Sequence, residues 1–265
     1  MPVIIKLYSY KNHKRMRILL LIIIAFLFTS FNIVPLVANR LATIEAHTAT
    51  TENKSEYIEL YNDFGLDETL HFEAFEQAMY GLEKINAKNK NIITIIDFTL
   101  PSSEKRMVVL DLAKKQVLFH TIVSHGRNSG EKYATSFSNK HGSYQSSLGF
   151  YLTENTYFGA NGYSLRLEGL EKGINDQAKP RAVVIHGADY CSEEVIKSTG
   201  RLGRSYGCPA LPREINEAVI DTIKNGSLLY IYANNKEYAT TSELVNPKGN
   251  YHLAENEKSG NNNRV

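Results

Sequence analysis

Two side chains in this sequence have the chemistry and the setting of a reactive pair. Cys208 lies in the stretch GRLGRSYGCPALP, whose glycines and prolines predict a tight loop. His186 follows the apolar run in RAVVIHG, which predicts a buried strand. A cysteine attacks as the thiolate, and an imidazole is its usual activator because a free thiol is mostly protonated at neutral pH. The pattern therefore indicates a nucleophile, Cys208, and a general base, His186.

The residues around Cys208 predict how its loop would assist attack on a carbonyl. Such attack creates an oxyanion, which successive backbone N–H groups in a glycine-containing turn stabilise. Tyr206, Gly207 and Cys208 supply such groups with Ser205 as loop support, whereas Pro209 has no N–H to donate. Gly207 also removes a side chain that would crowd the carbonyl. We therefore expect the oxyanion site in this loop.

Two other interpretations of the cysteines stay open at this point. The chain has two cysteines, and in an oxidising compartment Cys191 and Cys208 could form a disulfide that closes a short loop. A zinc site is less well supported, because His186, Cys191 and Cys208 lack the paired spacing of zinc ligands. We expect no metal and no cofactor. Spacing alone does not separate a nucleophile from a disulfide.

The N-terminus has the layout of an export signal. Basic residues precede the apolar run Ile18–Phe28, as in a secretory signal peptide that ends near Ala38. An uncleaved anchor is the alternative, because Ile18–Ala38 is long enough to span a bilayer, although Asn32 and Pro35 disfavour a membrane helix. Both interpretations place the rest of the chain outside the cytoplasm, in the periplasm or the cell envelope.

The net charge excludes one class of partner. The chain of 265 residues carries a formal net charge of +2, but residues 1–38 contain five Lys or Arg and no Asp or Glu. The remainder therefore carries about −3. This argues against nucleic acid as a partner bound by a basic surface.

The rest of the chain divides into four predicted segments. Residues 39–56 are polar and are interpreted as a linker. Residues 57–90 are predicted to be a helical extension, because apolar side chains recur at helical spacing. Residues 91–235 are predicted to be a mainly β domain with a helix, residues 213–226, after the cysteine loop. Residues 236–265 are polar and predict a disordered tail. Strands are expected at residues 92–98, 106–112, 116–124, 148–153, 163–170, 181–187 and 227–233.

These motifs together resemble the catalytic signature of the murein L,D-transpeptidases. The family pattern is His-Gly at a strand end, then Ser/Thr-x-Gly-Cys in a loop, and His186-Gly187 and Ser205–Cys208 match it. The stretch Ser136–Tyr151 resembles the family's upstream strand, and the likeness covers roughly residues 92–232. Two departures fit a divergent branch with Gly-Arg-Ser-x-Gly-Cys-Pro. Tyr206 replaces a usual histidine, and the arginine that usually follows the cysteine is missing.

The resemblance implies a fold, a reaction and a set of site residues. The fold would be a mainly β, mixed sandwich-like domain with a helical N-terminal extension and a helix beside the catalytic loop. Cys208 would attack the third residue of a peptidoglycan tetrapeptide stem, releasing D-alanine and leaving a thioester that a second stem resolves as a 3→3 crosslink. Candidate substrate-binding residues are Gly187, Tyr190, Arg201 and Arg204. Arg201 and Arg204 are also candidates to replace the missing arginine, and the sequence leaves open whether either does so.

Other outcomes stay open under the same resemblance. Water as the acceptor would make the protein an L,D-carboxypeptidase, hydrolase or amidase, and a lysine of an envelope protein would make it an attachment enzyme. A further alternative is a non-catalytic envelope-binding domain on the same scaffold, with Cys208 oxidised or buried. Of these, we expect the transpeptidase.

Overall fold

The structure is a computed structural model in which residues 54–245 are described. The predicted signal or anchor, residues 1–38, lies outside this range, as do the linker up to residue 53 and the tail from residue 246. Within the described range, none of the helices has both the length and the apolar character needed to cross a membrane.

One mixed sheet of eight strands organises the described residues. The strands are β1 (Asn89–Asp97), β2 (Met107–Asp111), β3 (Gln116–Thr121), β4 (Gly149–Gly159), β5 (Gly162–Gly169), β6 (Val184–Gly187), β7 (Ala210–Leu211) and β8 (Ser227–Tyr232). Their order is β3-β2-β1-β8-β4-β5-β6-β7, and all neighbours are antiparallel except β1–β8 and β6–β7. The predicted mainly β fold is confirmed.

The sheet curls until its two edge regions meet. Ser124, just beyond β3, forms an antiparallel bridge with Ala210 of β7, and Gly126 bridges Ser205. These contacts join the segment after β3 to the cysteine loop. The long loop after β3 therefore becomes the support of the loop that holds Cys208.

The helices differ in part from those expected. Residues 54–63 are helical, followed by α2 (Phe72–Lys84), α3 (Glu193–Thr199), α4 (Arg213–Ile223) and α5 (Lys236–Thr241). The predicted helical extension is thus broken between residues 64 and 71. Gly65 has φ of +63°, a left-handed conformation that ends a helix and that glycine adopts readily. The helix predicted after the cysteine loop is confirmed as α4.

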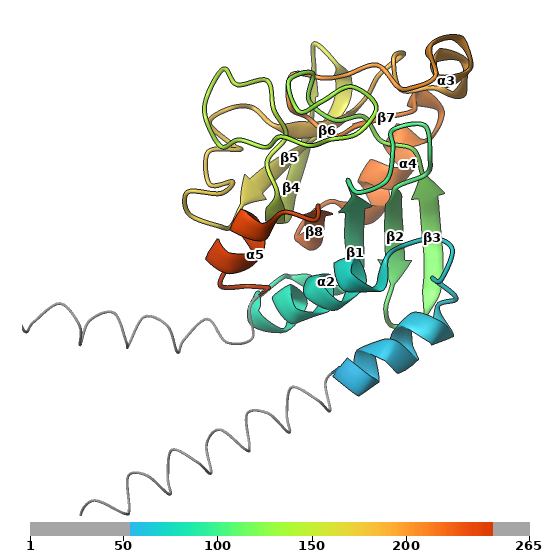
Figure 1. Ribbon diagram of the computed structural model, residues 1–265, viewed down its shortest axis with the longest axis vertical. Coiled ribbons are helices and arrows are strands. Elements are labelled where there is room, and N and C mark those ends of the chain that lie inside the picture. Colours follow the sequence, from blue (N-terminus) through green and yellow to red (C-terminus); the bar gives the residue numbers. More distant parts are fainter. Residues whose placement is uncertain (1–53, 246–265) are drawn as a thin grey trace, which may run out of the picture. The chain divides into compact units, whose positions relative to one another are not determined.

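Helix α2 packs onto the sheet and belongs to the same core. Its buried side chains, spaced three and four residues apart, include Phe75, Ala78 and Leu82. A Cβ on Gly81 would lie 2.2 Å from the ring of Phe150, so only glycine allows this approach of helix to sheet. Figure 1 shows α2 across the lower end of β1, with the long loops gathered at the opposite end beside β6, β7 and α3.

The first part of the predicted disordered tail is a packed helix instead. Tyr238 of α5 is buried, and its hydroxyl donates to the buried carboxylate of Glu171 at 3.2 Å. Ser242 also donates to Glu171. Burial raises the pKa of Glu171. The polar composition did not predict this helix, because hydrogen bonds to a buried acid hold the segment in place and it has no apolar stripe.

Candidate active site

The strand pair β6–β7 places both predicted catalytic residues. His186 is the third residue of β6 and lies opposite Ala210 of β7 on one side and Ser164 of β5 on the other. Cys208 precedes Ala210 by two positions. Helix α4 begins after Pro212 and buries Val219, Ile220 and Ile223, which fixes the chain that leaves the cysteine loop. Sequence and pairing thus bring the thiol loop to the strand that carries His186.

The sulfur of Cys208 rests against the backbone at the start of β6. The N–H of Val184 donates to Sγ at 3.4 Å, and the thiol donates to the carbonyl of Ala182 at 3.7 Å. Ala182 has φ of +56°, an unusual conformation for a residue with a side chain. Within residues 54–245, no hydrogen bond joins Sγ to His186. The resting thiol is therefore held by the backbone.

The surroundings of Cys208 act on its ionisation in opposite directions. Burial raises the pKa of the thiol, while the hydrogen bond from Val184 N–H and the positive charge of Arg181 lower it. Both cysteines are free thiols, with Cys208 half-buried and Cys191 fully buried. The disulfide interpretation is not realised in this structure.

His186 is held as a neutral base. Its side chain is buried, and Nδ1 lies 3.0 Å from the carbonyl oxygen of Gly187. A carbonyl oxygen only accepts, so Nδ1 carries the proton and Nε2 keeps its lone pair. Burial lowers the pKa of His186, and Arg213 lowers it further. The imidazole is therefore unprotonated at neutral pH and able to take a proton.

The loop from Ser205 to Cys208 is closed by its own serine. Ser205 Oγ accepts from Gly207 N–H at 3.0 Å and donates to the Cys208 carbonyl at 2.6 Å. Gly207 has φ of +124°, and a Cβ there would lie 2.9 Å from the carbonyl oxygen of Gln145. With the Gly207 amide engaged, Cys208 and Tyr206 are the predicted oxyanion donors whose N–H groups have no acceptor among the described residues.

A buried polar pair, Arg106 and His125, which the sequence analysis did not predict, supports this loop. Arg106 is 1% exposed and donates to the carbonyls of Val123 and Leu100 and to Nδ1 of His125. The backbone carbonyl of His125 in turn accepts from Ser205 N–H at 3.0 Å. Burial, together with Arg106, lowers the pKa of His125 to about 4, and burial lowers that of Arg106 to about 9. The neutral imidazole thus serves as an acceptor for a buried cation.

The two arginines predicted to bind substrate have protein partners. Arg204 pairs with Glu131 at 2.7 Å and donates to two backbone carbonyls, and Arg201 pairs with the same carboxylate at 3.1 Å. Both side chains brace the cysteine loop against residues 127–131. Their role in substrate binding stays a prediction.

Two further predicted site residues lie on the chain beyond His186. Tyr190 is half-buried, packs against Gly203 and is close enough to Cys208 for a thiolate to raise its pKa, although burial is the larger cause. Gly187 lies against α4, where a Cβ would approach Asn216 to 2.7 Å. Tyr190 therefore packs against the cysteine loop at Gly203, whereas the lack of a side chain at Gly187 serves packing.

An exposed aromatic pair lies beside the loop of Cys208. Tyr206 is 68% exposed, and its ring lies 4.8 Å from that of Tyr144, while the Arg127 guanidinium lies 5.8 Å from the Tyr206 ring centroid. Tyr144 has φ of +54°. Of the sequence-predicted residues, Tyr206 is thus the most accessible to a substrate.

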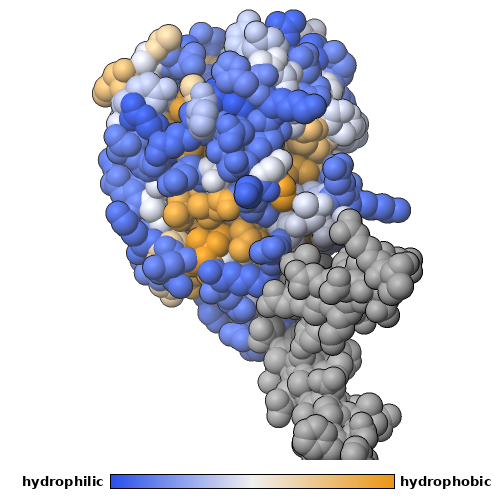
Figure 2. Space-filling view, turned by 90° about the vertical axis from the view of Figure 1, so that its left-hand side faces the viewer, coloured by the Kyte–Doolittle hydropathy of each residue, from blue (hydrophilic) through white to orange (hydrophobic). Residues whose placement is uncertain are grey.

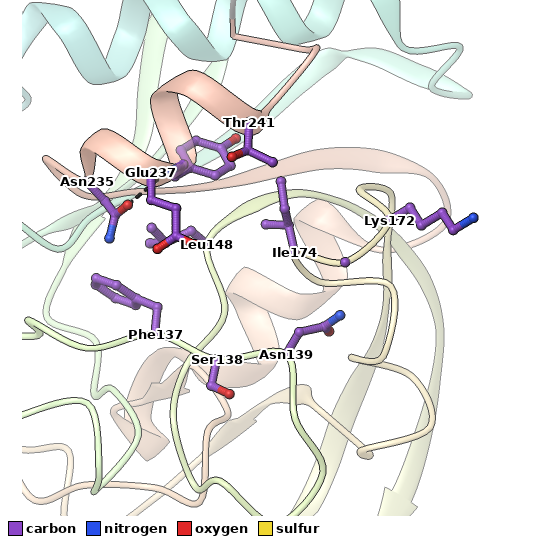
Figure 3. A pocket seen from close by; sticks show the side chains of 11 residues that line it. Phe137, Ser138, Asn139, Leu148, Lys172, Ile174, Asn235, Glu237 and Thr241 are labelled. Carbon is purple, nitrogen blue, oxygen red and sulfur yellow. Dashed lines mark hydrogen bonds between the residues drawn. The ribbon is translucent and has the colours of Figure 1, made fainter. Parts of the chain in front are cut away.

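A separate pocket of about 240 Å³ lies beside α5 and does not include Cys208 or His186 (Figure 3). Apolar side chains of Phe137, Leu148 and Ile174 line it, with Asn235 and Glu237 from the start of α5. On the face that lies to the left in Figure 1, Figure 2 shows an apolar area surrounded by hydrophilic side chains.

In residues 54–245, no cluster of three or more His, Cys, Asp or Glu side chains could hold a metal ion.

Comparison with known proteins identifies the family. Residues 66–232 match the family model described as L,D-transpeptidase catalytic domain. Among curated proteins, none matches the chain.

Solved structures similar to this chain are also L,D-transpeptidases or cell-shape proteins. An L,D-transpeptidase from Mycobacterium smegmatis is 15% identical, with a TM-score of 0.33 over 54% of this chain and 59% of the other. The helical cell shape determining protein from Campylobacter jejuni is 15% identical, with a TM-score of 0.38 over 61% and 57%. An Enterococcus faecium L,D-transpeptidase is 13% identical, with a TM-score of 0.34 over 54% and 50%. The match thus spans between half and about three fifths of these structures.

The matched region contains the cysteine loop, His186 and the whole eight-stranded sheet. It covers well over half of the chain. The protein belongs to the L,D-transpeptidase catalytic-domain family.

Proposed function

We propose that this protein is a cysteine acyltransferase that joins peptidoglycan stem peptides. The observation that carries the proposal is the free, half-buried thiol of Cys208, two residues before the strand that pairs with β6, where a buried, neutral His186 keeps an unprotonated Nε2. Membership of the L,D-transpeptidase family supports peptidoglycan as the substrate.

In the proposed first step, Cys208 attacks the carbonyl carbon of the third stem residue. The S–H leaves the Ala182 carbonyl, and its proton passes to Nε2 of His186 as the C–S bond forms. The Cys208 and Tyr206 amides stabilise the oxyanion. His186 then returns the proton to the nitrogen of the terminal D-alanine, the C–N bond breaks, and a thioester remains on Cys208.

In the proposed second step, an amine of another stem attacks the thioester. His186 accepts the amine proton and returns it to the sulfur as the C–S bond breaks, so the thiol is regenerated and an amide crosslink forms. Water in place of the amine gives a free carboxylate, which is the carboxypeptidase outcome. No observation favours an envelope protein as the acceptor.

Product masses test the proposal directly. Purified protein would be incubated with disaccharide-tetrapeptide, and the products analysed by mass spectrometry. We expect a dimer that has lost one D-alanine, with Cys208→Ala giving none. A tripeptide product without dimer would establish hydrolysis instead. Unchanged substrate, with a thiol that reacts normally with iodoacetamide, would contradict acyl transfer on this substrate and favour a binding domain.

We also propose that the domain works outside the cytoplasmic membrane. The basic and then apolar N-terminus motivates this, although it lies outside the described residues. Residues 1–56 would be fused to one reporter that is active only after export and to another active only in the cytoplasm. Activity of the exported reporter is expected, and activity of the cytoplasmic one alone would contradict the proposal.

A further inference from the structure

We propose that Arg181 supplies the positive charge that stabilises the Cys208 thiolate, in place of the arginine that this sequence lacks after the cysteine. The inference rests on the proposed function only in taking Cys208 as the nucleophile. Arg181 lies far from the cysteine loop in sequence, where Arg201 and Arg204 are the candidates to replace the missing residue.

Arg181 reaches the nucleophile through the turn that opens β6. It directly precedes Ala182, whose carbonyl accepts from the Cys208 thiol. A Cβ placed on Gly207 would lie 3.3 Å from Nη2 of Arg181, so the guanidinium lies against the residue before the nucleophile. The left-handed Ala182 bends the chain so that Arg181 and the Val184 N–H both act on the sulfur.

Arg181 is fixed by neutral acceptors alone. Nη1 donates to the Ser138 carbonyl at 2.7 Å and to Ser147 Oγ at 2.6 Å, and Nη2 donates to the Gln145 carbonyl at 2.7 Å and to Ser143 Oγ at 3.2 Å. These bonds hold the guanidinium rigidly and tie down the loop of residues 138–147. No carboxylate pairs with it among the described residues. A half-buried cation without a counter-ion favours a nearby anion.

Cys208 is the group that can become that anion. The two side chains whose negative charge would act on Arg181 are Tyr151 and Cys208. Burial raises the pKa of Tyr151 far above neutrality, so its phenol stays protonated. Arg201 and Arg204, by contrast, share the single carboxylate of Glu131, and the positive charge that lowers the pKa of the thiol is that of Arg181. Arg181 therefore places an unpaired charge against the cysteine loop, and it acts through Cys208 as an electrostatic and positioning residue.

The test measures the ionisation of Cys208 without any murein substrate. Iodoacetamide labelling of Cys208 would be followed against pH in a Cys191→Ser background, for the parent and for Arg181→Met, Arg181→Lys and Arg204→Met. We expect Arg181→Met to move the labelling midpoint up by about one pH unit, which is about a tenfold loss of thiolate at a given pH below the midpoint. Arg181→Lys keeps the charge and should stay near the parent. Arg204→Met is the matched control, a hydrogen-bonded arginine of the same loop region whose charge is already paired, and it should not move the midpoint.

Two results would overturn the inference. Superimposable profiles for Arg181→Met and the parent would remove Arg181 from thiolate stabilisation while leaving Cys208 as the nucleophile. Equal shifts in Arg181→Met and Arg181→Lys would show that the loop hydrogen bonds matter and the charge does not. If circular dichroism shows that Arg181→Met is unfolded, Arg181→Gln replaces it, because the amide keeps donors for the loop carbonyls but no charge, and the same upward shift is expected.

Discussion

At the residue scale, burial disfavours the charged forms of both side chains, the thiolate of Cys208 and the imidazolium of His186. Burial raises the pKa of Cys208 and lowers that of His186, so a resting thiolate–imidazolium pair is disfavoured. In the mechanism that we propose, the thiol loses its proton to His186 during attack, and Val184 N–H and Arg181 favour the anion that forms. The sequence predicted both residues of this pair, because a strand end and a Gly-Cys-Pro loop are local patterns. It did not predict Arg181, because only the folded chain brings that side chain against Gly207, the residue before Cys208.

Replacement of His186 by alanine should separate a base from a structural histidine. Without the base, labelling of Cys208 by iodoacetamide should be slow at neutral pH and recover only above the ordinary thiol range of about pH 8.5, because burial raises the pKa of this thiol. In the parent protein, His186 can act as a base only while it is unprotonated. Because burial lowers its pKa, the rate of turnover should fall with decreasing pH only below about pH 6.5. His120→Ala, at a histidine on β3, is the control. Identical labelling profiles for His186→Ala and the parent would exclude the dyad.

Cys191 should not be labelled by iodoacetamide in the native protein. It is fully buried, and burial raises the pKa of its thiol to about 11. Native protein should therefore show one rapidly labelled thiol, with the second appearing only after denaturation. Cys191→Ser should keep most of the activity, because serine is of similar size. Ellman titration gives the count, and two missing thiols in the native, non-reduced protein would restore the disulfide interpretation.

At the scale of elements, the strands were predictable and the short or polar elements were not. β1, β2 and β8 are runs of β-branched and aliphatic residues, which identify strands locally. α3 buries none of its residues, and β7 has two residues, so neither leaves a periodic signal. The support of the catalytic loop was also hidden, because the contact between His125 and Arg106 depends on the pairing of β2 with β3 and on the closure of the sheet.

The buried pair of His125 and Arg106 predicts that the protein loses stability in acid. The pKa of His125 falls from an ordinary 6.5 to about 4 in the folded protein. Below pH 6.5 the unfolded chain therefore binds a proton that the folded protein does not, and the free energy of unfolding falls by about 1.4 kcal/mol per pH unit until roughly pH 4. The total is on the order of 3 kcal/mol.

Urea unfolding at pH 7.5 and pH 4.5 would measure this effect. His125→Asn keeps an acceptor for Arg106 but does not titrate in this range, so the variant should lose markedly less stability between the two pH values than the parent. His141→Asn, at an exposed histidine, should behave like the parent. Equal losses in His125→Asn and the parent would show that another group controls acid stability.

At the scale of the whole molecule, the helical segment before β1 and the β domain form one folding unit. Residues 55–245 lie in a single compact unit, and the family match begins at residue 66, ahead of α2. The sequence predicted the helical segment as an extension because amphipathic spacing shows that a face is buried but not what covers it. The structure places that face on the sheet, where Phe75 is fully buried and Gly81 adjoins Phe150.

Truncation before the helical segment should therefore leave the domain folded, whereas truncation after it should not. A fragment of residues 54–245 should fold, unfold in one cooperative urea transition and label at Cys208 like the full chain. A fragment of residues 89–245 lacks several buried aliphatic and aromatic side chains, each of which contributes about 1.5–3 kcal/mol by burial. Their combined loss approaches the total stability of a typical domain, about 5–15 kcal/mol. This shorter fragment should bind a dye for exposed apolar surface and show no cooperative transition.

Within the longer fragment, single substitutions should confirm the cause. Phe75→Ala should lower the free energy of unfolding by about 3–5 kcal/mol while keeping one transition, because a large core side chain is removed. Ile58→Ala, at a residue that is 43% exposed, should change it little. A cooperative transition of residues 89–245 at the same urea midpoint as residues 54–245 would instead establish the helical segment as a separable extension. In that case the thiol chemistry of Cys208 should persist in the shorter fragment, and labelling would show it.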